Sequence, residues 1–195
     1  MEIRLNYAVT AIVELLAQRR PSSPTLLAID GHSAAGKSSL ARAIQEVHPA
    51  STVVQMDDFY RPLTARTRNG LSAVDGYQQY YDWQRLEAQV LHPLVAGHPA
   101  RYQRYDWSTN DLAEWSTVLP TGLVIIEGCY AARPELRGYY QAIVVVVAPE
   151  ATRQQRQRLR ADATQEWLDR WDAAERYYID HTALLTDADL IVPGE

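Results

Sequence analysis

Residues 26–40 of the chain read LLAIDGHSAAGKSSL. The four apolar residues that open this stretch are too few for a helix and are closed by Asp30 and Gly31, which predicts a buried strand. Residues 31–38 then fit the pattern G-x-x-x-x-G-K-[ST], and a helical pattern follows over residues 38–47. A strand, a glycine-bearing loop and a helix in this order are what a phosphate-binding loop requires.

The chemistry of this loop predicts a site for a nucleoside triphosphate. Glycines let the backbone N–H groups approach phosphate oxygens, and the following helix points the positive end of its dipole at the anion. Lys37 would place its charge at the β- and γ-phosphates, and the Ser38 hydroxyl can reach Mg²⁺. The alternative, a glycine-rich turn with a surface lysine, does not need the flanking strand and helix. We therefore expect ATP and Mg²⁺ at Gly31, Ser33, Ala34, Ala35, Gly36, Lys37, Ser38 and Ser39.

The rest of the chain predicts a parallel sheet covered by helices. Further apolar runs occur at residues 52–54, 123–126, 143–147 and 190–192, and helical patterns at residues 5–19, 85–96 and 152–178. Continuous rather than alternating apolar runs are typical of strands that are buried on both faces. Residues 62–76 are polar and contain glycine, which predicts a loop. We expect a single α/β domain over residues 1–195, of the three-layer P-loop NTPase type, with about five parallel strands.

Composition narrows the class of protein. The chain has 195 residues, 47% of them hydrophobic, and a formal net charge of -5, which disfavours a nucleic-acid partner. Its one cysteine allows no intramolecular disulfide. No signal-like segment opens the sequence and no apolar run approaches the ~20 residues that span a bilayer, so we expect a cytoplasmic protein without a membrane partner. Composition leaves homo-oligomerisation open.

Acidic residues follow two of the predicted strands. Asp57 and Asp58 come after residues 52–54, and Glu127 comes directly after residues 123–126. The carboxyl ends of parallel strands form the rim where open α/β sheets bind ligands. One carboxylate of the Asp57–Asp58 pair could orient Mg²⁺ and one could take a proton from an attacking hydroxyl, while Glu127 could hold Mg²⁺ through a bound water. The alternatives are turn or capping roles for these acids, and we expect Asp30 to brace the loop.

The ordered set of motifs resembles the uridine kinase family of phosphate-loop nucleoside kinases. The resemblance runs from Leu26 to the C-terminus and rests on residues 31–39, 56–62 (MDDFYRP), 81–83 (YDW), 104–107 (RYDW), 126–128 (IEG) and 188–194 (ADLIVPG). It implies that Asp57 deprotonates the 5′-hydroxyl of a sugar and that Asp82 binds the ribose hydroxyls. It also implies that Tyr60 and Tyr105 lie near the nucleobase.

The resemblance further implies a lid over roughly residues 150–180, with Arg156 and Arg160 at its arginine positions. Arginines beside a phosphate site can neutralise the charge of the transferring phosphoryl group. A solvated basic helix face would give the same sequence pattern. Asp82 could instead cap a helix, and Tyr105 could belong to the core.

Three features depart from the family's pattern. The lid continues as ADATQEWLDRW (residues 161–171) where the family has an arginine-glycine-arginine stretch, and Asn110 stands where the family has a base-binding histidine. Arg101 and Arg104 alternate with tyrosines, which suits an acceptor that carries a phosphate or carboxylate, or an outward-facing strand with ion pairs. These departures concern the acceptor and not the nucleotide.

We therefore predict an ATP-dependent kinase that phosphorylates a hydroxyl of a small molecule, with the 5′-hydroxyl of uridine or cytidine as the leading acceptor. Ribosylnicotinamide, a pantothenate-like compound and a sugar phosphate are alternative acceptors, and Arg104 would then contribute to binding. Two other classes remain open: an ATP-binding regulator without catalysis, and a nucleic-acid-processing ATPase, which the acidic balance disfavours.

Overall fold

The computed structural model describes residues 2–19, 22–159 and 164–194. Within these residues, parallel strands form a five-stranded sheet in the order β2-β5-β1-β6-β7. These strands are β1 (Thr25–Asp30), β2 (Ser51–Gln55), β5 (Leu123–Glu127), β6 (Ala142–Val147) and β7 (Leu190–Pro193). The predicted sheet is confirmed, and each predicted strand is present.

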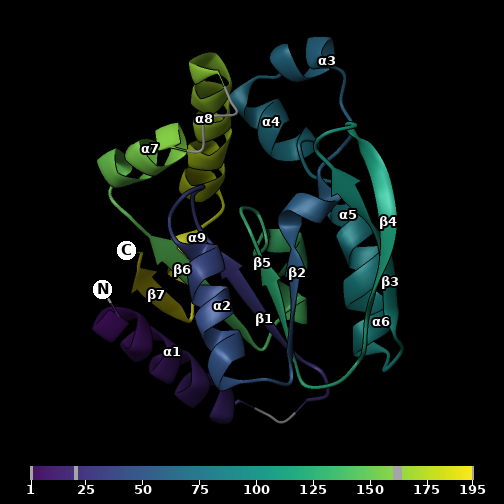
Figure 1. The fold of residues 1–195 in the computed structure, drawn as a ribbon, viewed down its shortest axis with the longest axis vertical. Coiled ribbons are helices and arrows are strands. Elements are labelled where there is room, and N and C mark those ends of the chain that lie inside the picture. The colour runs from purple at the N-terminus through teal and green to yellow at the C-terminus, as the bar shows by residue number, and fades with distance from the viewer. Residues whose placement is uncertain (1, 20–21, 160–163, 195) are drawn as a thin grey trace.

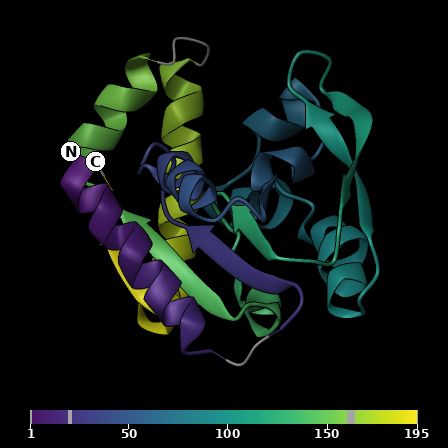
Figure 2. The ribbon, with the colours of Figure 1, turned by 60° about the horizontal axis from the view of Figure 1, so that its bottom comes forward.

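Helices cover both faces of the sheet because successive strand residues point to opposite sides. In β1, Leu27 and Ile29 pack with α1 (Glu2–Ala17) and α2 (Lys37–Val47), whereas Leu26 and Ala28 face a second core. The second core is closed by helices that include α8 (Gln165–His181) and α9 (Leu184–Asp187). Figures 1 and 2 show the resulting layers, with α1 and α2 on one side of the sheet. The predicted three-layer α/β class is therefore confirmed.

A second group of elements lies beside the β2 edge of the sheet. It contains the antiparallel hairpin of β3 (Ala100–Asp106) and β4 (Asp111–Val118), at the right in Figure 1. Its helices are α3 (Ala65–Asn69), α4 (Ala73–Gln79), α5 (Trp83–Leu86) and α6 (His92–Val95), and a π-helical turn (Glu87–Leu91) joins the last two. Short 3₁₀ turns at Met56–Phe59 and Pro134–Tyr139 follow β2 and precede β6.

The prediction of a loop over residues 62–76 was wrong, because two capped helices occupy this stretch. The Thr64 side chain accepts a hydrogen bond from the backbone N–H of Thr67 at the start of α3. Ser72 caps α4 in the same way through the N–H of Asp75. Such caps satisfy backbone donors that a first turn leaves free, so polar residues start these helices instead of preventing them.

The predicted helix over residues 152–178 is two helices, α7 (Glu150–Leu159) and α8, which diverge in Figure 1. Within the described residues, no helix is both long enough and apolar enough to cross a membrane.

Candidate active site

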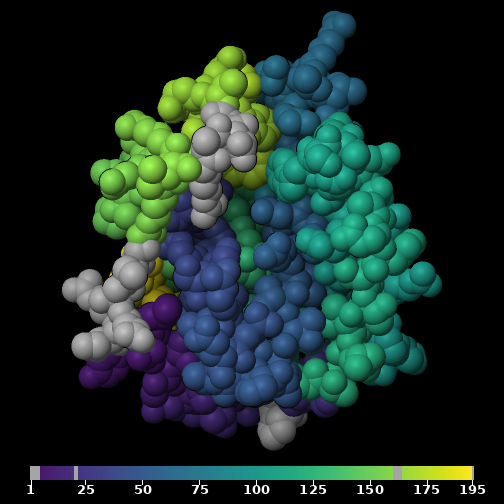
Figure 3. All heavy atoms as spheres, in the orientation of Figure 1, coloured from purple at the N-terminus to yellow at the C-terminus, as the bar shows by residue number. Residues whose placement is uncertain are grey.

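A pocket of about 610 Å³ opens at the carboxyl ends of β1, β2 and β5. That volume is in the range of small-molecule sites. In the space-filling view the surface is hollowed between α7 and α8 on one side and the β3–β4 hairpin on the other (Figure 3). The residues that line it are Ser33, Ala34, Gly36, Lys37, Ser38, Ser39, Gln55, Asp57, Tyr81, Trp107, Glu127, Gly128, Cys129, Gln157, Trp167, Leu168 and Trp171.

The phosphate loop, residues 31–39, forms the floor of one half of this pocket. Gly31 has φ +133°, and a Cβ there would lie 2.2 Å from the carbonyl oxygen of Val146, so only glycine fits. Lys37 is buried at the start of α2, and its Nζ donates to the carbonyl oxygens of Gly31 at 3.0 Å and His32 at 2.9 Å. The ammonium group is thus held over the loop. Six of the eight predicted nucleotide-binding residues line the pocket. The other two, Gly31 and Ala35, are buried and do not line it.

Asp30 braces the loop from below, as expected. Its fully buried carboxylate accepts hydrogen bonds from the backbone N–H groups of Gly31 (2.6 Å), Tyr130 (3.2 Å) and Ala132 (2.7 Å). The hydroxyl of Tyr178 in α8 donates to the same group at 2.8 Å. Burial raises the pKa of Asp30 although these donors act in the opposite direction.

The two adjacent aspartates after β2 have different surroundings. Asp57 faces the pocket and accepts a hydrogen bond of 2.9 Å from the Tyr81 hydroxyl. Asp58 is buried, and its carboxylate accepts from Tyr102 at 3.2 Å and from Arg104 Nε at 2.9 Å. The Asp58 carboxylate therefore anchors the β3–β4 hairpin, whereas Asp57 lines the pocket.

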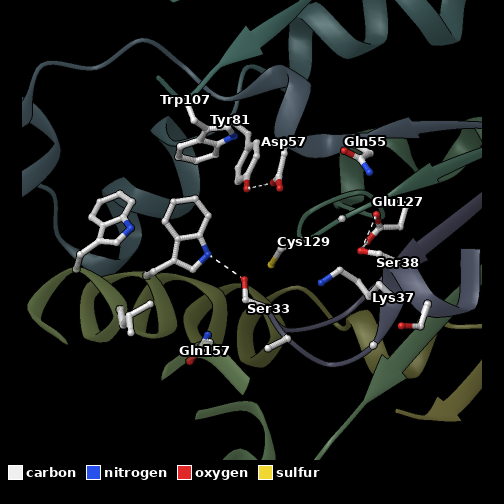
Figure 4. Close-up of a pocket in the computed structure, with 17 residues that line it drawn as sticks. Ser33, Lys37, Ser38, Gln55, Asp57, Tyr81, Trp107, Glu127, Cys129 and Gln157 are labelled. Atoms are coloured by element: carbon white, nitrogen blue, oxygen red, sulfur yellow. Dashed lines mark hydrogen bonds between the residues drawn. The ribbon is translucent and has the colours of Figure 1, made fainter. Parts of the chain in front are cut away.

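Asp57 and Lys37 extend into the pocket from opposite sides (Figure 4). Although the surface of Asp57 is open to the pocket, the protein around it removes much bulk hydration, and this desolvation raises the pKa of its carboxyl. The hydrogen bond from Tyr81 and the charge of Lys37 partly oppose that rise. A carboxylate with a raised pKa is a better proton acceptor than an ordinary aspartate.

Ser38 and Glu127 form an oxygen-rich corner beside Lys37. The Ser38 Oγ lies 3.3 Å from both carboxylate oxygens of Glu127. Burial raises the pKa of Glu127, and the charge of Lys37 opposes this. A hydroxyl and a carboxylate are hard donors of the kind that Mg²⁺ takes in phosphate sites, so these residues fit the predicted ion.

The other half of the pocket is lined by aromatic side chains. We call Tyr81, Trp107, Trp167 and Trp171 the aromatic wall; together with Leu168 they face Asp57 and the phosphate loop. Rings behind the wall fix it in place: Tyr80 stacks on Trp171 at 5.1 Å and 11° between planes, and Tyr60 stacks on Trp107 at 4.6 Å. This packing presents flat apolar surface to a ligand.

Four predicted acceptor-side residues do not line the pocket. Tyr60 is fully buried behind Trp107, and Tyr105 is buried edge-on to the same tryptophan at 5.0 Å. Asp82 caps α5 by accepting from the N–H of Arg85, the capping role that the sequence left open. Arg104 pairs with Asp58 and Glu114. Direct contacts of these residues with an acceptor stay predictions.

The arginines of the predicted lid differ in position. Arg156 lies on the phosphate loop, where its Nη1 donates to the carbonyl oxygen of Ala34 at 3.0 Å. Arg153 is buried and pairs with Asp172 at 3.0 Å, whereas Arg158 is exposed. Arg160 lies outside the described residues. The proposed transition-state role of Arg156 and Arg160 stays a prediction.

Sequence reasoning gave no role to several residues of the site. Tyr81 is part of the YDW motif at residues 81–83, but only the structure shows that its hydroxyl donates a hydrogen bond to the Asp57 carboxylate. Trp167 and Trp171 belong to the stretch that departs from the family's pattern, and their spacing of four residues on α8 is the signal that places both on one side of that helix. Glu175, one further turn along, reaches the phosphate loop.

The chain is similar to proteins described as kinases. A pantothenate kinase of Bradyrhizobium sp. (strain ORS 278) is 26% identical over 206 residues, which cover 94% of this chain and 62% of that protein. A pantothenate kinase of Shewanella denitrificans is 36% identical over 125 residues, covering 60% of this chain and 40% of the relative. The chain thus spans less than two thirds of the length of these relatives.

The same fold occurs in a structure described as a possible uridine kinase from Bacillus stearothermophilus, with a TM-score of 0.74 and 22% identity. The two chains are covered to 98% and 100%. Residues 26–182, which include the phosphate loop, both acidic motifs and the aromatic wall, match the Phosphoribulokinase / Uridine kinase family. The chain belongs to this family.

Proposed function

We propose that this protein is an ATP-dependent kinase that transfers the γ-phosphoryl group to a hydroxyl of a small molecule. One observation carries the proposal: a single pocket places Asp57 opposite Lys37, with the Ser38–Glu127 corner beside the lysine. Phosphoryl transfer asks for these parts, a cationic cradle for the phosphates and a carboxylate that can accept the proton of the attacking hydroxyl.

Each residue then has a defined task. The loop amides and Lys37 hold the β- and γ-phosphates, and Asp57 orients the acceptor hydroxyl and takes its proton. Ser38 and Glu127 would hold Mg²⁺, which neutralises charge on the phosphates when it is bound. Arg156 already contacts the loop at Ala34 and stands where a cation can approach the transferring group.

The aromatic wall favours an acceptor with a flat ring, and we propose the 5′-hydroxyl of a nucleoside such as uridine or cytidine. Stacking of a base on an aromatic side chain contributes about 1–3 kcal/mol. Among the described residues that line the pocket, Lys37 carries the only positive charge, and the triphosphate would occupy it. Of the two arginines expected to meet an anionic acceptor, Arg104 is paired with two carboxylates and Arg101 stacks on the ring of Trp115.

Pantothenate is the second candidate, because the curated relatives are pantothenate kinases. Pantothenate carries a carboxylate, and a buried anion needs a cationic or multiply hydrogen-bonding partner. The pairing of Arg104 therefore argues against pantothenate and against sugar phosphates. The proposed reaction takes place in the cytoplasm, where ATP is available.

A coupled ADP-release assay tests the proposal. The wild-type protein is screened with Mg²⁺ and ATP against nucleosides, ribosylnicotinamide, pantothenate and sugar phosphates, with Lys37→Ala as the blank. We expect uridine or cytidine to raise ADP release by roughly 10²- to 10³-fold over the blank, the usual cost of removing a group that stabilises transition-state charge. If no acceptor exceeds the blank, the kinase proposal fails; if only pantothenate does, the nucleoside assignment fails.

A further inference from the structure

Glu175 of α8 is a fully buried carboxylate for which the phosphoryl-transfer chemistry provides no task. Its Oε2 accepts from the backbone N–H of Ser33 at 2.8 Å and lies 3.3 Å from Nδ1 of His32. Its Oε1 accepts from the hydroxyl of Ser33 and from the indole N–H of Trp171. Both oxygens are therefore committed to the phosphate loop or to the aromatic wall.

This arrangement needs a carboxylate. The ionised group offers two acceptor oxygens, whereas an amide offers one, and the donors here approach both oxygens. Burial alone would raise the pKa of Glu175, yet the hydrogen bonds from His32 and Ser33 and the charge of Lys37 bring that pKa below its ordinary value. A buried charge that is fully hydrogen-bonded fixes the positions of its donors, because any displacement leaves it unsatisfied.

The donors on Glu175 come from the two halves of the pocket. Ser33 belongs to the phosphate loop, and Trp171 belongs to the aromatic wall one helical turn before Glu175. The indole N–H of Trp171 also lies 3.2 Å from the Ser33 hydroxyl, the bond drawn in Figure 4. A shift of the wall therefore changes hydrogen bonds that hold the loop.

We propose that Glu175 is a positioning residue that couples the aromatic wall to the phosphate loop through Trp171 and Ser33. The loop is held in its phosphate-binding form by an anion that lies on α8 and not in the loop itself. A change in the position of Trp171 thereby changes the hydrogen bonds that hold the nucleotide-binding loop. The inference rests on the proposed function only because it assumes that the acceptor binds at the aromatic wall. The effect on the loop can be measured through nucleotide binding, without any acceptor.

Titration calorimetry with Mg²⁺ and the non-hydrolysable analogue AMP-PNP tests the coupling. Trp171→Phe keeps an aromatic ring and removes the N–H, so we expect the Kd to rise roughly 3- to 10-fold, the usual effect of one lost hydrogen bond. Trp115→Phe, on the exposed face of β4, is the matched control and should leave the Kd unchanged. A merely structural defect would lower the fraction of binding-competent protein and leave the Kd of that fraction as it was.

A double-mutant cycle gives a second test of the coupling, and Glu175→Gln gives a third that requires neither of the variants in the cycle. Ser33→Ala removes the hydroxyl that shares Oε1 with Trp171, so Trp171→Phe and Ser33→Ala should affect the Kd non-additively. Glu175→Gln should raise the Kd at least as much as Trp171→Phe, since one acceptor oxygen is lost. Additive effects, or a wild-type Kd in Trp171→Phe, would overturn the coupling. Because no turnover is measured, these outcomes are independent of whether the screen finds an acceptor.

Discussion

The two halves of the pocket are built in different ways. The phosphate half comes from one segment, residues 31–39, together with Glu127 at the end of β5. The aromatic wall comes from three segments far apart in the chain: Tyr81 before α5, Trp107 after β3, and Trp167 and Trp171 on α8. The phosphate half is formed mainly by the backbone of one contiguous segment, whereas the aromatic wall forms only when the tertiary structure brings its three segments together.

This difference explains why fold and chemistry can be shared while acceptors differ. The loop must offer N–H groups to phosphates. Its backbone requires glycine at Gly31, where φ is +133° and a Cβ would meet the carbonyl oxygen of Val146, and Lys37 stands at the start of the helix. The wall must only present a surface of suitable shape and charge, and many combinations of side chains on the hairpin and α8 can do so. We therefore propose that the acceptor is selected at the wall.

Asp57 lies where the two halves meet, and its replacement should have the largest effect. Asp57→Asn keeps the size and polarity of the side chain but removes the proton acceptor, so kcat should fall roughly 10²- to 10⁴-fold. The Kd of AMP-PNP should stay near the wild-type value, because the loop is intact. Steady-state ADP release and calorimetry measure the two quantities.

Asp180→Asn, at an exposed position of α8, is the control and should leave kcat unchanged. If Asp57→Asn turns over at the wild-type rate, Asp57 is not the base, and the ATP-binding regulator becomes the better description of the protein.

Trp107→Ala should act on the aromatic wall alone. It removes the most exposed ring of the wall, 49% accessible, so the KM for uridine, or for the acceptor that the screen identifies, should rise about tenfold. The KM for ATP should change far less, because the hydrogen bonds that link the wall to the loop run through Trp171 and Ser33 and not through Trp107. Trp115→Ala is a matched control, since Trp115 is 51% accessible and lies on β4 outside the pocket. An equal rise in both KM values would mean that the wall does not distinguish acceptor from nucleotide.

The difference between the two halves of the pocket also explains how much of the structure could be predicted from the sequence. The strands and the phosphate loop were predictable because a strand buried on both faces is a continuous apolar run and the loop is a contiguous pattern. Residues 62–76 were misread because Thr64 and Ser72 cap helices with the same polar side chains that mark loops.

On the acceptor side, individual residues could be named but not oriented. Tyr60 belongs to a quoted motif, yet the structure buries it behind Trp107. The choice between Asp57 and Asp58 depends on Arg104 and Tyr102, which arrive from the hairpin and fill the Asp58 carboxylate. The resemblance implied Asp57 as the base, but the contacts that occupy Asp58 could not be inferred around residue 57, because their donors come from a strand almost fifty positions later.

The smallest predicted effect concerns Tyr81, a residue of the aromatic wall whose hydroxyl donates a hydrogen bond to the proposed base, Asp57. Desolvation by the surrounding protein raises the pKa of the Asp57 carboxyl, whereas this bond stabilises the charged form and so lowers it. Tyr81→Phe removes the lowering contribution, so the pKa of Asp57 should rise further. The base must be deprotonated to accept a proton, and the acid limb of log kcat against pH should therefore move to higher pH.

The rate on the plateau above that limb should change little in Tyr81→Phe, because the phenyl ring still fills the wall. Burial also raises the pKa of Glu127, so the limb must be assigned to one of the two acids. Titrating Mg²⁺ makes the assignment: a limb that belongs to a metal-holding Glu127 moves to lower pH as Mg²⁺ increases, whereas one that belongs to Asp57 follows Tyr81→Phe. A limb that responds to Mg²⁺ and ignores Tyr81→Phe would remove Asp57 from the role of base even if its replacement lowered kcat.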